Sequence, residues 1–249
     1  AGVVPDGPPL LEIDGLRAGE LLDGRLTGRG GEIVGVVGLL GSGIIDLAHA
    51  LTGRIPVEAG TVALGGRPAD PGDFAGLSAR GLAAVVGERT DRVAVGLSVE
   101  ENLTLGVLRR FFRRGRLRRR EVAAAAADAI AAYEIRCAGP DVEMASLSGG
   151  NQQKAAIAKV LAQRPQVLVL EEPCHGVDER GRREIRTMLR AAAADGALVV
   201  VVDSDLDEVL GLCSRVVVLR EGRMTAELDP RRTRREALLD ACYGTTKDG

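Results

Sequence analysis

Three short aliphatic runs constrain the fold of this chain more than any other feature. They lie at residues 31–37, 167–170 and 197–202, and valine, leucine and isoleucine dominate them. Unbroken apolar runs of strand length are typical of parallel sheets whose two faces are both covered by helices. Because helix-forming segments separate the runs, the sequence predicts an α/β fold built on a mainly parallel sheet.

The remaining segments supply helices and edge strands to this sheet. Ser98 and Glu101 have the spacing of a capping box at the start of a helix, and Pro165 ends the helix that begins at Ser148. We expect further strands at residues 10–16, 60–67, 82–86 and 215–219, and further helices at residues 44–52, 98–108, 121–133, 178–194, 206–212 and 231–241.

This pattern predicts one domain over residues 10–244, with a linker at residues 1–9 and a tail at residues 245–249. Within the domain we expect a small antiparallel β subdomain on the N-terminal side. A helical subdomain is expected over about residues 98–148.

Composition narrows the class of protein. Aromatic residues make up only 2% of the 249 residues, so the core must be aliphatic, and the net charge of −2 gives no global attraction to nucleic acid or to anionic membranes. The four cysteines lack zinc-site spacing, which favours reduced thiols in the cytoplasm. No apolar run reaches the roughly 18 residues of a membrane span, and no signal peptide is visible. Because the chain starts at Ala1 rather than Met, we interpret it as part of a longer protein.

A glycine-rich loop follows the first aliphatic run. Gly38, Gly41, Ser42 and Gly43 match the phosphate loop G-x-x-x-x-G-K-[ST] up to its second glycine, where backbone N–H groups turn toward phosphate. The lysine and the hydroxyl residue that should come next are Ile44 and Ile45. Losing the lysine alone predicts triphosphate binding weaker by about 10–100-fold. The alternative is an ordinary glycine turn.

Two further motifs lie downstream. L-S-G-G-N-Q-Q-K, residues 147–154, places a serine and two glycines at the start of a helix, where the dipole favours anions. A plain serine N-cap explains the serine but not the residues after it. V-L-V-L-E-E-P, residues 167–173, ends a buried strand in two carboxylates, where α/β proteins bind ligands. The alternative is a solvated strand end.

These motifs resemble the ATP-binding-cassette (ABC) family, whose signature is the L-S-G-G core. The longer form is similar to the second cassette of bacterial monosaccharide importers, and the resemblance covers about residues 11–244. It implies a P-loop NTPase-type fold with ATP and Mg²⁺ as cofactors. Cassettes of this family pair head to tail, so the signature of one faces the phosphate loop of the other.

The resemblance also assigns residues. It makes Glu172 the general base, puts Glu171 in place of the Asp associated with Mg²⁺, and puts Asp178 in the loop that crosses to the partner cassette. Glu88 is nearest to a glutamine that senses Mg²⁺, and Ser204 lies where a histidine normally contacts the γ-phosphate. Residues that would contact nucleotide are Gly38, Gly41, Ser42, Gly43, Ile44, Ile45, Glu88, Ser148, Gly149, Gly150, Gln152 and Ser204.

Five departures from the family pattern fall in one site. The lysine, the Ser/Thr, the glutamine, the histidine and the adenine-stacking aromatic all belong to the site whose phosphate loop this chain supplies. The resemblance therefore implies an asymmetric pair, in which this chain lends its signature to a competent site on a partner cassette. Its own site would be degenerate, and the isolated chain would bind ATP weakly and hydrolyse little.

The implied partners are a second cassette, membrane permease subunits and, indirectly, a periplasmic or surface sugar-binding protein. The implied location is the cytoplasmic face of the membrane, and no nucleic acid is expected. Three alternatives stay open. They are a non-catalytic regulatory or scaffold cassette, a nucleic-acid-linked ABC ATPase and a nucleoside importer, whose substrate choice lies in other subunits.

Two other features attract attention. Residues 109–120 hold eight arginines beside Phe111 and Phe112, and the favoured interpretation is a solvated surface. Contact with a membrane subunit or lipid headgroups comes next, and nucleic acid last. His49 is interpreted as an ordinary packed or surface residue of the helix after the glycine loop.

Overall fold

The computed structural model describes residues 7–245, so the linker and tail predictions for residues 1–6 and 246–249 lie outside the described residues. The chain divides into two compact units. The core unit comprises the described parts of residues 1–86, 166–173 and 189–249, and the helical unit comprises residues 87–165 and 174–188. The chain therefore leaves the core unit twice and returns to it twice.

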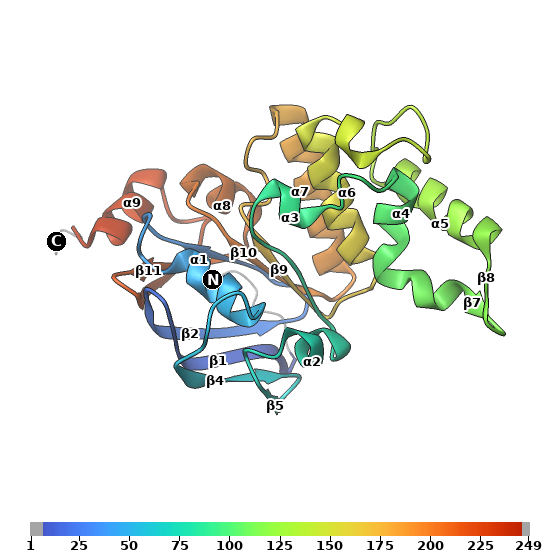
Figure 1. Cartoon of the computed structure of the whole chain (residues 1–249). Coiled ribbons are helices and arrows are strands. Elements are labelled where there is room, and N and C mark those ends of the chain that lie inside the picture. The colour runs from blue at the N-terminus through green and yellow to red at the C-terminus, as the bar shows by residue number, and fades with distance from the viewer. Residues whose placement is uncertain (1–6, 246–249) are drawn as a thin grey trace. The chain divides into compact units, whose positions relative to one another are not determined.

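The core unit is built on a ten-stranded sheet in the order β5-β4-β1-β2-β12-β11-β3-β10-β9-β6 (Figure 1). From β11 to β6 all neighbouring strands are parallel, whereas β1, β2, β4 and β5 pair antiparallel. The expected mainly parallel sheet and the expected small antiparallel part are both confirmed. The strands are β1 (Pro9–Ala18), β2 (Leu21–Arg29), β3 (Ile33–Val37), β4 (Ala59–Leu64), β5 (Arg67–Ala69), β6 (Leu82–Val85), β9 (Val167–Glu171), β10 (Leu198–Val202), β11 (Arg215–Arg220) and β12 (Arg223–Leu228).

The three aliphatic runs form the centre of this sheet. Every residue of β3, β9 and β10 is buried, as expected for strands covered on both faces. In the register, Val202 at the end of β10 lies opposite Val36 on one side and Glu171 on the other. The carboxyl ends of all three strands therefore meet at one edge of the sheet, which is where the candidate site lies.

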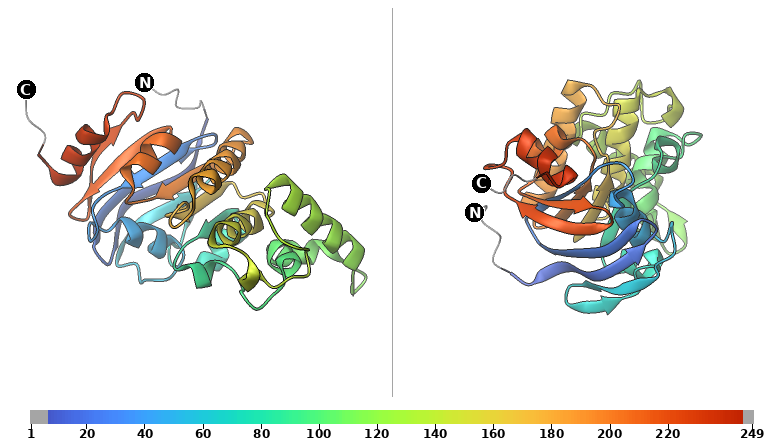
Figure 2. Two further views of the ribbon diagram at one scale, coloured as in Figure 1. Left: turned by 90° about the horizontal axis from the view of Figure 1, so that it is seen from above. Right: turned by 90° about the vertical axis from the view of Figure 1, so that its left-hand side faces the viewer.

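Four helices and the last part of α7 (Glu179–Ala194) complete the described core unit. The four are α1 (Ile44–Leu51), α2 (Phe74–Ala79), α8 (Leu206–Leu212) and α9 (Arg235–Tyr243). α8 contacts β3, and α9 contacts β11 (Figure 2). The last helix begins four residues later than expected, because Arg231 and Thr233 instead hydrogen-bond to Asp229 in a turn.

The helical unit contains α3 (Arg89–Arg92), α4 (Val99–Thr104), the 3₁₀ helix η1 (Leu105–Phe111), β7 (Phe112–Arg113), β8 (Arg116–Leu117), α5 (Arg119–Ala132), η2 (Met144–Ser146), α6 (Gly149–Leu161) and the first part of α7 (Glu179–Ala194). The capping box of Ser98 and Glu101 is confirmed. No helix among residues 7–245 is both long enough and apolar enough to cross a membrane.

The segment expected to be helical over residues 98–108 is helical, but the α-helix ends at Thr104 and a 3₁₀ helix continues from it. The hairpin of β7 and β8 was not expected. Its two turn residues, Arg114 and Gly115, have φ values of 49° and 77°. Two positive φ values define the tight turn that suits a two-residue hairpin, but an arginine at the first position gives no sequence signal for it.

Gly35 in β3 lies where α8 and the residue after it pack closely on the sheet. A Cβ atom there would lie 2.5 Å from Val209 Cγ1 and 2.8 Å from Cys213 Sγ, both closer than real Cβ contacts allow. We expect Gly35→Ala to lower the free energy of unfolding by about 1–3 kcal/mol through overpacking. Urea denaturation followed by circular dichroism measures this. Gly96→Ala, which meets nothing within 4 Å, is the control. Equal stability of the two variants would contradict the close packing.

Candidate functional site

The glycine loop connects β3 to α1 in the core unit. Gly41 and Gly43 have φ values of 79° and 91°, which favour glycine. Gly38 is required for space, since a Cβ there would lie 2.4 Å from the Leu219 carbonyl oxygen and 2.5 Å from Ser42 Oγ. Within the loop the Ser42 N–H donates to the Leu39 carbonyl oxygen, and the Ser42 carbonyl oxygen accepts from the Gly222 N–H. The loop therefore has the tight, glycine-dependent backbone that the sequence predicts.

The buried hydroxyl of Ser42 is the unusual polar group of this loop. The residue is only 6% exposed, and its Oγ has no hydrogen-bond partner among residues 7–245. A buried hydroxyl without a partner lowers the stability of the folded protein by about 1–3 kcal/mol. Such groups are rare in native proteins and usually have a functional reason. A phosphate oxygen held by the loop would supply the missing partner. The loop therefore fits an anion of this kind.

The two isoleucines after the loop face the core. Ile44 is 2% exposed and belongs to the main hydrophobic cluster, and Ile45 packs against the same cluster. Position 44 therefore brings an apolar side chain to the core where a phosphate loop brings a charged side chain to the ligand. Position 45 likewise offers no hydroxyl for a metal ion.

The two carboxylates lie at the end of β9. Glu171 is 8% exposed, and its Oε2 lies 3.0 Å from His49 Nε2 of α1. The interpretation of His49 as an ordinary packed or surface residue missed this contact, which joins residues 122 positions apart. Glu172 has a φ of 40°, a strained value for a residue other than glycine. Ser204 Oγ donates a 2.9 Å hydrogen bond to Glu172 Oε1 and holds that carboxylate in place.

Asp203 follows β10 beside this pair and was not predicted as a site residue. Burial raises its pKa to about 7, and the negative charges of Glu172, Asp205 and Glu208 add to the shift. A hydrogen bond from the Asp205 N–H opposes it. The edge of the sheet is therefore rich in carboxylates and poor in cations among the described residues.

The same residues test whether a metal ion fits. Residues 7–245 contain no group of three or more His, Cys, Asp or Glu side chains placed to hold one. Mg²⁺ commonly binds through one or two carboxylates together with the oxygens of a bound phosphate. Glu171 is the carboxylate predicted for that role, and its Oε2 already contacts His49. The loop thus fits a phosphate, while Mg²⁺ would depend on Glu171 and on oxygens of the nucleotide.

The signature lies in the helical unit, at the start of α6. Ser148 is exposed and occupies the N-cap position, but its side chain makes no capping hydrogen bond. Instead, its Oγ accepts a 2.9 Å hydrogen bond from Asn151 Nδ2. Gly150 lies beside Val177, since a Cβ on the glycine would be at van der Waals distance, 3.4 Å, from Val177 Cγ1. The first N–H groups of α6 and the Ser148 hydroxyl hydrogen are therefore left for an external acceptor.

The N-Q-Q-K extension fixes this helix to its surroundings. Asn151 Oδ1 accepts from the Arg136 N–H, which adds a second contact to the one with Ser148. Gln152 is buried, and its Nε2 donates to the carbonyl oxygens of Met144 and Leu147 just before the signature. Gln152 was predicted to contact nucleotide, and the structure gives its amide these backbone partners.

The last two residues of the extension bind other segments. Gln153 Oε1 accepts a 3.2 Å hydrogen bond from Arg92 of α3. Lys154 is 2% exposed, and its Nζ donates to the Glu134 carbonyl oxygen and, at 2.7 Å, to Glu184 Oε2. The four side chains therefore hold the segments before the signature, at residues 134–136, in α3 and in α7, which explains why the motif extends beyond the glycines.

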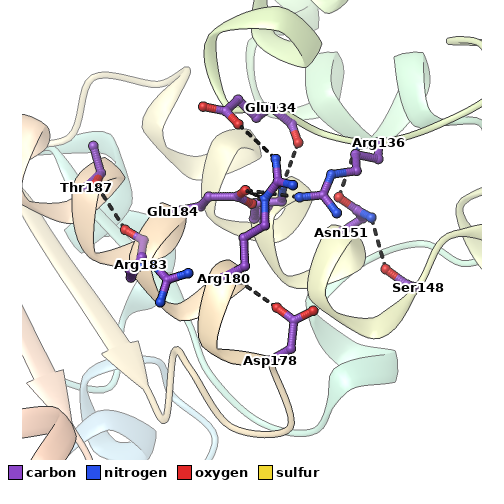
Figure 3. A network of polar contacts seen from close by, with 11 residues as sticks. Glu134, Arg136, Ser148, Asn151, Asp178, Arg180, Arg183, Glu184 and Thr187 are labelled. Atoms are coloured by element: carbon purple, nitrogen blue, oxygen red, sulfur yellow. Dashed lines mark hydrogen bonds and ion pairs between the residues drawn. The ribbon is translucent and has the colours of Figure 1, made fainter.

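Glu184 of α7 is the centre of a charge network, the Glu184 cluster, which also contains Glu134, Arg136, Lys154 and Arg180 (Figure 3). Its carboxylate lies within 3.1 Å of nitrogens from Arg136, Lys154 and Arg180. Burial alone would raise the pKa of Glu184, but hydrogen bonds from Lys154 and Arg180 and the charges of Lys154 and Arg136 lower it to about 2.

Asp178 and Glu88 are the remaining predicted residues of the helical unit. Asp178 precedes α7, and its Oδ1 accepts a 2.7 Å hydrogen bond from the Gly181 N–H. Its neighbour Val177 is the residue that packs beside Gly150, so this unit brings Asp178 and the signature together. Glu88 is exposed at the start of α3.

The predicted residues therefore form two groups. The core unit brings together Gly38, Gly41, Ser42, Gly43, Ile44, Ile45, Glu171, Glu172 and Ser204. The helical unit holds Glu88, Ser148, Gly149, Gly150, Gln152 and Asp178. A phosphate-type loop, a strand ending in carboxylates and a helix that begins within L-S-G-G without a side-chain cap define a cassette of the P-loop NTPase class.

Comparison with known proteins names the family. The family model described as "ABC transporter" matches residues 22–175, which is more than half of the chain. The chain belongs to the ABC transporter family.

Two curated relatives have closely similar sequences. The "Ribose import ATP-binding protein RbsA 2" of Rubrobacter xylanophilus is 38% identical over 243 residues, which cover 96% of this chain and 46% of that protein. The "Putative ribose/galactose/methyl galactoside import ATP-binding protein 3" of Agrobacterium fabrum is 38% identical over 224 residues, covering 89% of this chain and 45% of that protein. The chain thus spans less than half the length of these relatives.

Solved structures support the fold. CbiO1 of Clostridium perfringens, described as part of the ABC transporter complex cbiONQ, has a TM-score of 0.75 at 22% identity and covers 96% of each chain. The ATP-binding cassette MJ0796, in a dimeric post-hydrolysis state bound to ADP and Pi, also has a TM-score of 0.75 at 22% identity, covering 90% of this chain and all of that one.

The Glu184 cluster predicts a pH-dependent contribution to stability. The carboxyl titrates at its ordinary value of 4.5 in the unfolded chain and at about 2 in the folded one. Its ionised form therefore stabilises the fold above pH 4.5, and this contribution is lost as the pH falls toward 2. We expect Glu184→Gln to be less stable than wild type at neutral pH, with a difference that shrinks below pH 4.5.

Urea denaturation at several pH values measures this difference. Glu179→Gln is the matched control, because it removes an exposed pair with Arg183 on the same helix. Such pairs contribute about 0–1 kcal/mol. A Glu184→Gln difference that stays constant with pH would show that the charge of Glu184 does not stabilise the unit.

Asp203 predicts the opposite pH dependence. Between the ordinary pKa of 3.8 and the folded pKa of about 7, the unfolded chain has lost this proton while the folded chain retains it. Stability therefore falls as the pH rises through this range. We expect Asp203→Asn to remove that fall and to be more stable than wild type above pH 7. Thermal denaturation across the range measures it, with exposed Asp128→Asn as control. Parallel curves for wild type and Asp203→Asn would contradict it.

Proposed function

We propose that this chain is the second ATP-binding cassette of a bacterial monosaccharide importer. It lends Ser148, Gly149 and Gly150 to an ATP site whose phosphate loop belongs to a partner cassette. Ser148 is exposed at the start of α6 and makes no capping hydrogen bond, which supports this role. Its hydroxyl and the first N–H groups of the helix can donate hydrogen bonds to an anionic ligand. The names of the two relatives, which are import ATP-binding proteins, support the transport assignment.

The site formed by this chain's own loop is proposed to be degenerate. The observation that carries this is the burial of Ile44, which is 2% exposed within the hydrophobic cluster. A lysine at that position would supply a charge-assisted hydrogen bond of about 1.5–3 kcal/mol to phosphate. The Ser42 hydroxyl and the loop backbone supply only neutral donors. Nucleotide binding at this site is therefore weak, and its function is structural or regulatory.

The proposed reaction is hydrolysis of ATP, in which water attacks the γ-phosphate, chiefly at the composite site whose phosphate loop the partner cassette supplies. At this chain's own site, where weak nucleotide binding keeps turnover low, Glu172 would accept the proton of the attacking water and Ser204 would orient its carboxylate. Mg²⁺, when bound, neutralises phosphate charge, and Glu171 is its proposed protein ligand. Asp178 lies in the loop directed to the partner. Hydrolysis drives sugar uptake through separate permease subunits, supplied by a periplasmic or surface sugar-binding protein, with the cassette on the cytoplasmic face of the membrane.

A second candidate is a regulatory or scaffold cassette that binds no nucleotide. The contact between His49 and Glu171 favours it, because the histidine takes up an oxygen proposed for the metal ion. A nucleoside importer is a third possibility, since substrate choice lies in other subunits. Nucleotide titration distinguishes the second candidate from the first.

The test is a titration of the 249-residue chain with Mg-ATP, beside the double variant Ile44→Lys/Ile45→Thr. We expect the native chain to stay silent below millimolar ATP, and the variant to bind at least about tenfold more tightly because it regains the lysine. Ser42→Ala in the variant background is expected to weaken binding again, because it removes the unpartnered hydroxyl. Circular dichroism checks that a lysine at the buried position leaves the fold intact.

Micromolar binding by the native chain would refute the degenerate site and make a second working site the default. Absence of binding in a folded double variant would favour the regulatory or scaffold cassette. Ile45→Thr alone, which changes a partly buried side chain, provides a milder variant if the double variant does not fold.

A further inference from the structure

The most unbalanced charge in the chain lies in residues 105–120 of the helical unit. This segment holds eight arginines and no lysine or acidic residue, so its charge is +8. The whole chain has a net charge of −2, which leaves −10 for the other residues. The segment forms η1, the hairpin of β7 and β8, and the start of α5, at one end of that helix (Figure 1).

The fold itself uses few of these arginines. Arg110 donates to the carbonyl oxygens of Ala162 and Gln163 after α6, and Arg118 forms an ion pair with Glu121. Arg119 interacts electrostatically with Glu101. The other five guanidinium groups are exposed and have no hydrogen bond or ion pair to any residue within 7–245. They belong to Arg109, Arg113, Arg114, Arg116 and Arg120.

Other arginine-rich segments of the chain are at least partly compensated by acidic residues. In residues 231–235, Arg232 lies beside Asp229 and Arg235 forms an ion pair with Asp207. On α7, Arg180 and Arg183 pair with glutamates one turn away. Unpaired like charges in the hairpin repel one another, which works against folding. A role in the fold alone therefore does not account for the hairpin arginines.

Two large apolar side chains are exposed in the same segment as these charges. Leu105 is 51% exposed and Phe112 is 49% exposed, in a chain with few aromatic residues. Guanidinium groups next to exposed leucine and phenylalanine match a membrane interface, where phosphates lie above an apolar layer. A nucleic acid fits less well, because it has no apolar layer to receive Leu105, whereas the charge of −10 on the rest of the chain opposes either anionic occupant equally.

We propose that this hairpin patch, formed by Leu105, Arg109, Phe112, Arg113, Arg114, Arg116 and Arg120, binds anionic phospholipid headgroups. The planar guanidinium groups match lipid phosphates in bidentate geometry, and Leu105 and Phe112 enter the boundary below them. Each arginine near an anionic surface contributes to the attraction, which extends over about one Debye length. The proposal goes beyond nucleotide binding and does not depend on it.

The test is co-sedimentation of the 249-residue chain with vesicles of phosphatidylcholine, with and without phosphatidylglycerol. We expect binding only to vesicles containing phosphatidylglycerol, and weaker binding as salt rises. The variant Arg109→Gln/Arg113→Gln/Arg116→Gln/Arg120→Gln is expected to bind at least about tenfold more weakly. Arg114 is left unchanged because its φ of 49° belongs to the turn. Circular dichroism confirms that each variant is folded.

The matched control removes the same charge elsewhere. Arg231→Gln/Arg232→Gln/Arg234→Gln/Arg235→Gln is expected to bind within about twofold of wild type, because the attraction is local. Phe112→Ser, with no change in charge, is expected to weaken binding, which separates the interface from a simple charge effect. Equal losses in the two quadruple variants, or no dependence on phosphatidylglycerol, would overturn the proposal. Tighter binding of a single-stranded RNA than of vesicles, lost in the first variant, would assign the patch to nucleic acid instead.

Discussion

The pairing of β10 with β3 on one side and β9 on the other is the constraint on which the site depends. The register places the ends of three strands level, so the residues that follow them gather at one edge of the sheet. The glycine loop follows β3, Glu172 follows β9, and Asp203 follows β10. A shift of one residue in this pairing would turn buried side chains to the opposite face and scatter these groups. The complete burial of all three strands fixes the register through packing.

In the helical unit, the start of α6 is held in place without a side-chain cap on its N–H groups. A helix start normally satisfies its N–H groups with its own N-cap side chain. Ser148 makes no such bond, and the helix is held instead by Asn151, Gln152, Gln153 and Lys154. The Glu184 cluster anchors the far side of the same turn. The signature therefore stays fixed in position while its own polar groups remain available.

Sequence reasoning recovered the parts of this structure that depend on local patterns. Uniformly aliphatic runs identify the central strands because burial on both faces leaves no room for polar residues. The capping box of Ser98 could also be predicted, because it depends on a local pattern of two residues three positions apart. The hairpin at Arg114 was missed, because only the surrounding structure imposes a positive φ on an arginine.

The contacts that define the site could not be read in this way. His49 meets Glu171 across 122 residues, and Lys154 meets Glu184 across 30. No periodicity links such pairs, because the folded sheet and the packing of α6 beside α7 bring them together. The sequence motif identified residues 147–154 as a functional segment, but only the structure shows which residue each of its side chains contacts. The unpartnered Ser42 hydroxyl belongs to the same class, since an absent bond leaves no trace in sequence.

The scarcity of lysine has a consequence for how the surface responds to its environment. The chain has only three lysines, of which Lys154 is buried and Lys159 donates to the Arg92 carbonyl oxygen. Positive charge on the described surface is therefore carried by arginine, whose guanidinium keeps its proton at any physiological pH. Lysine acetylation would leave that pattern of charge almost untouched. The electrostatic interactions of these surface arginines therefore respond mainly to ionic strength.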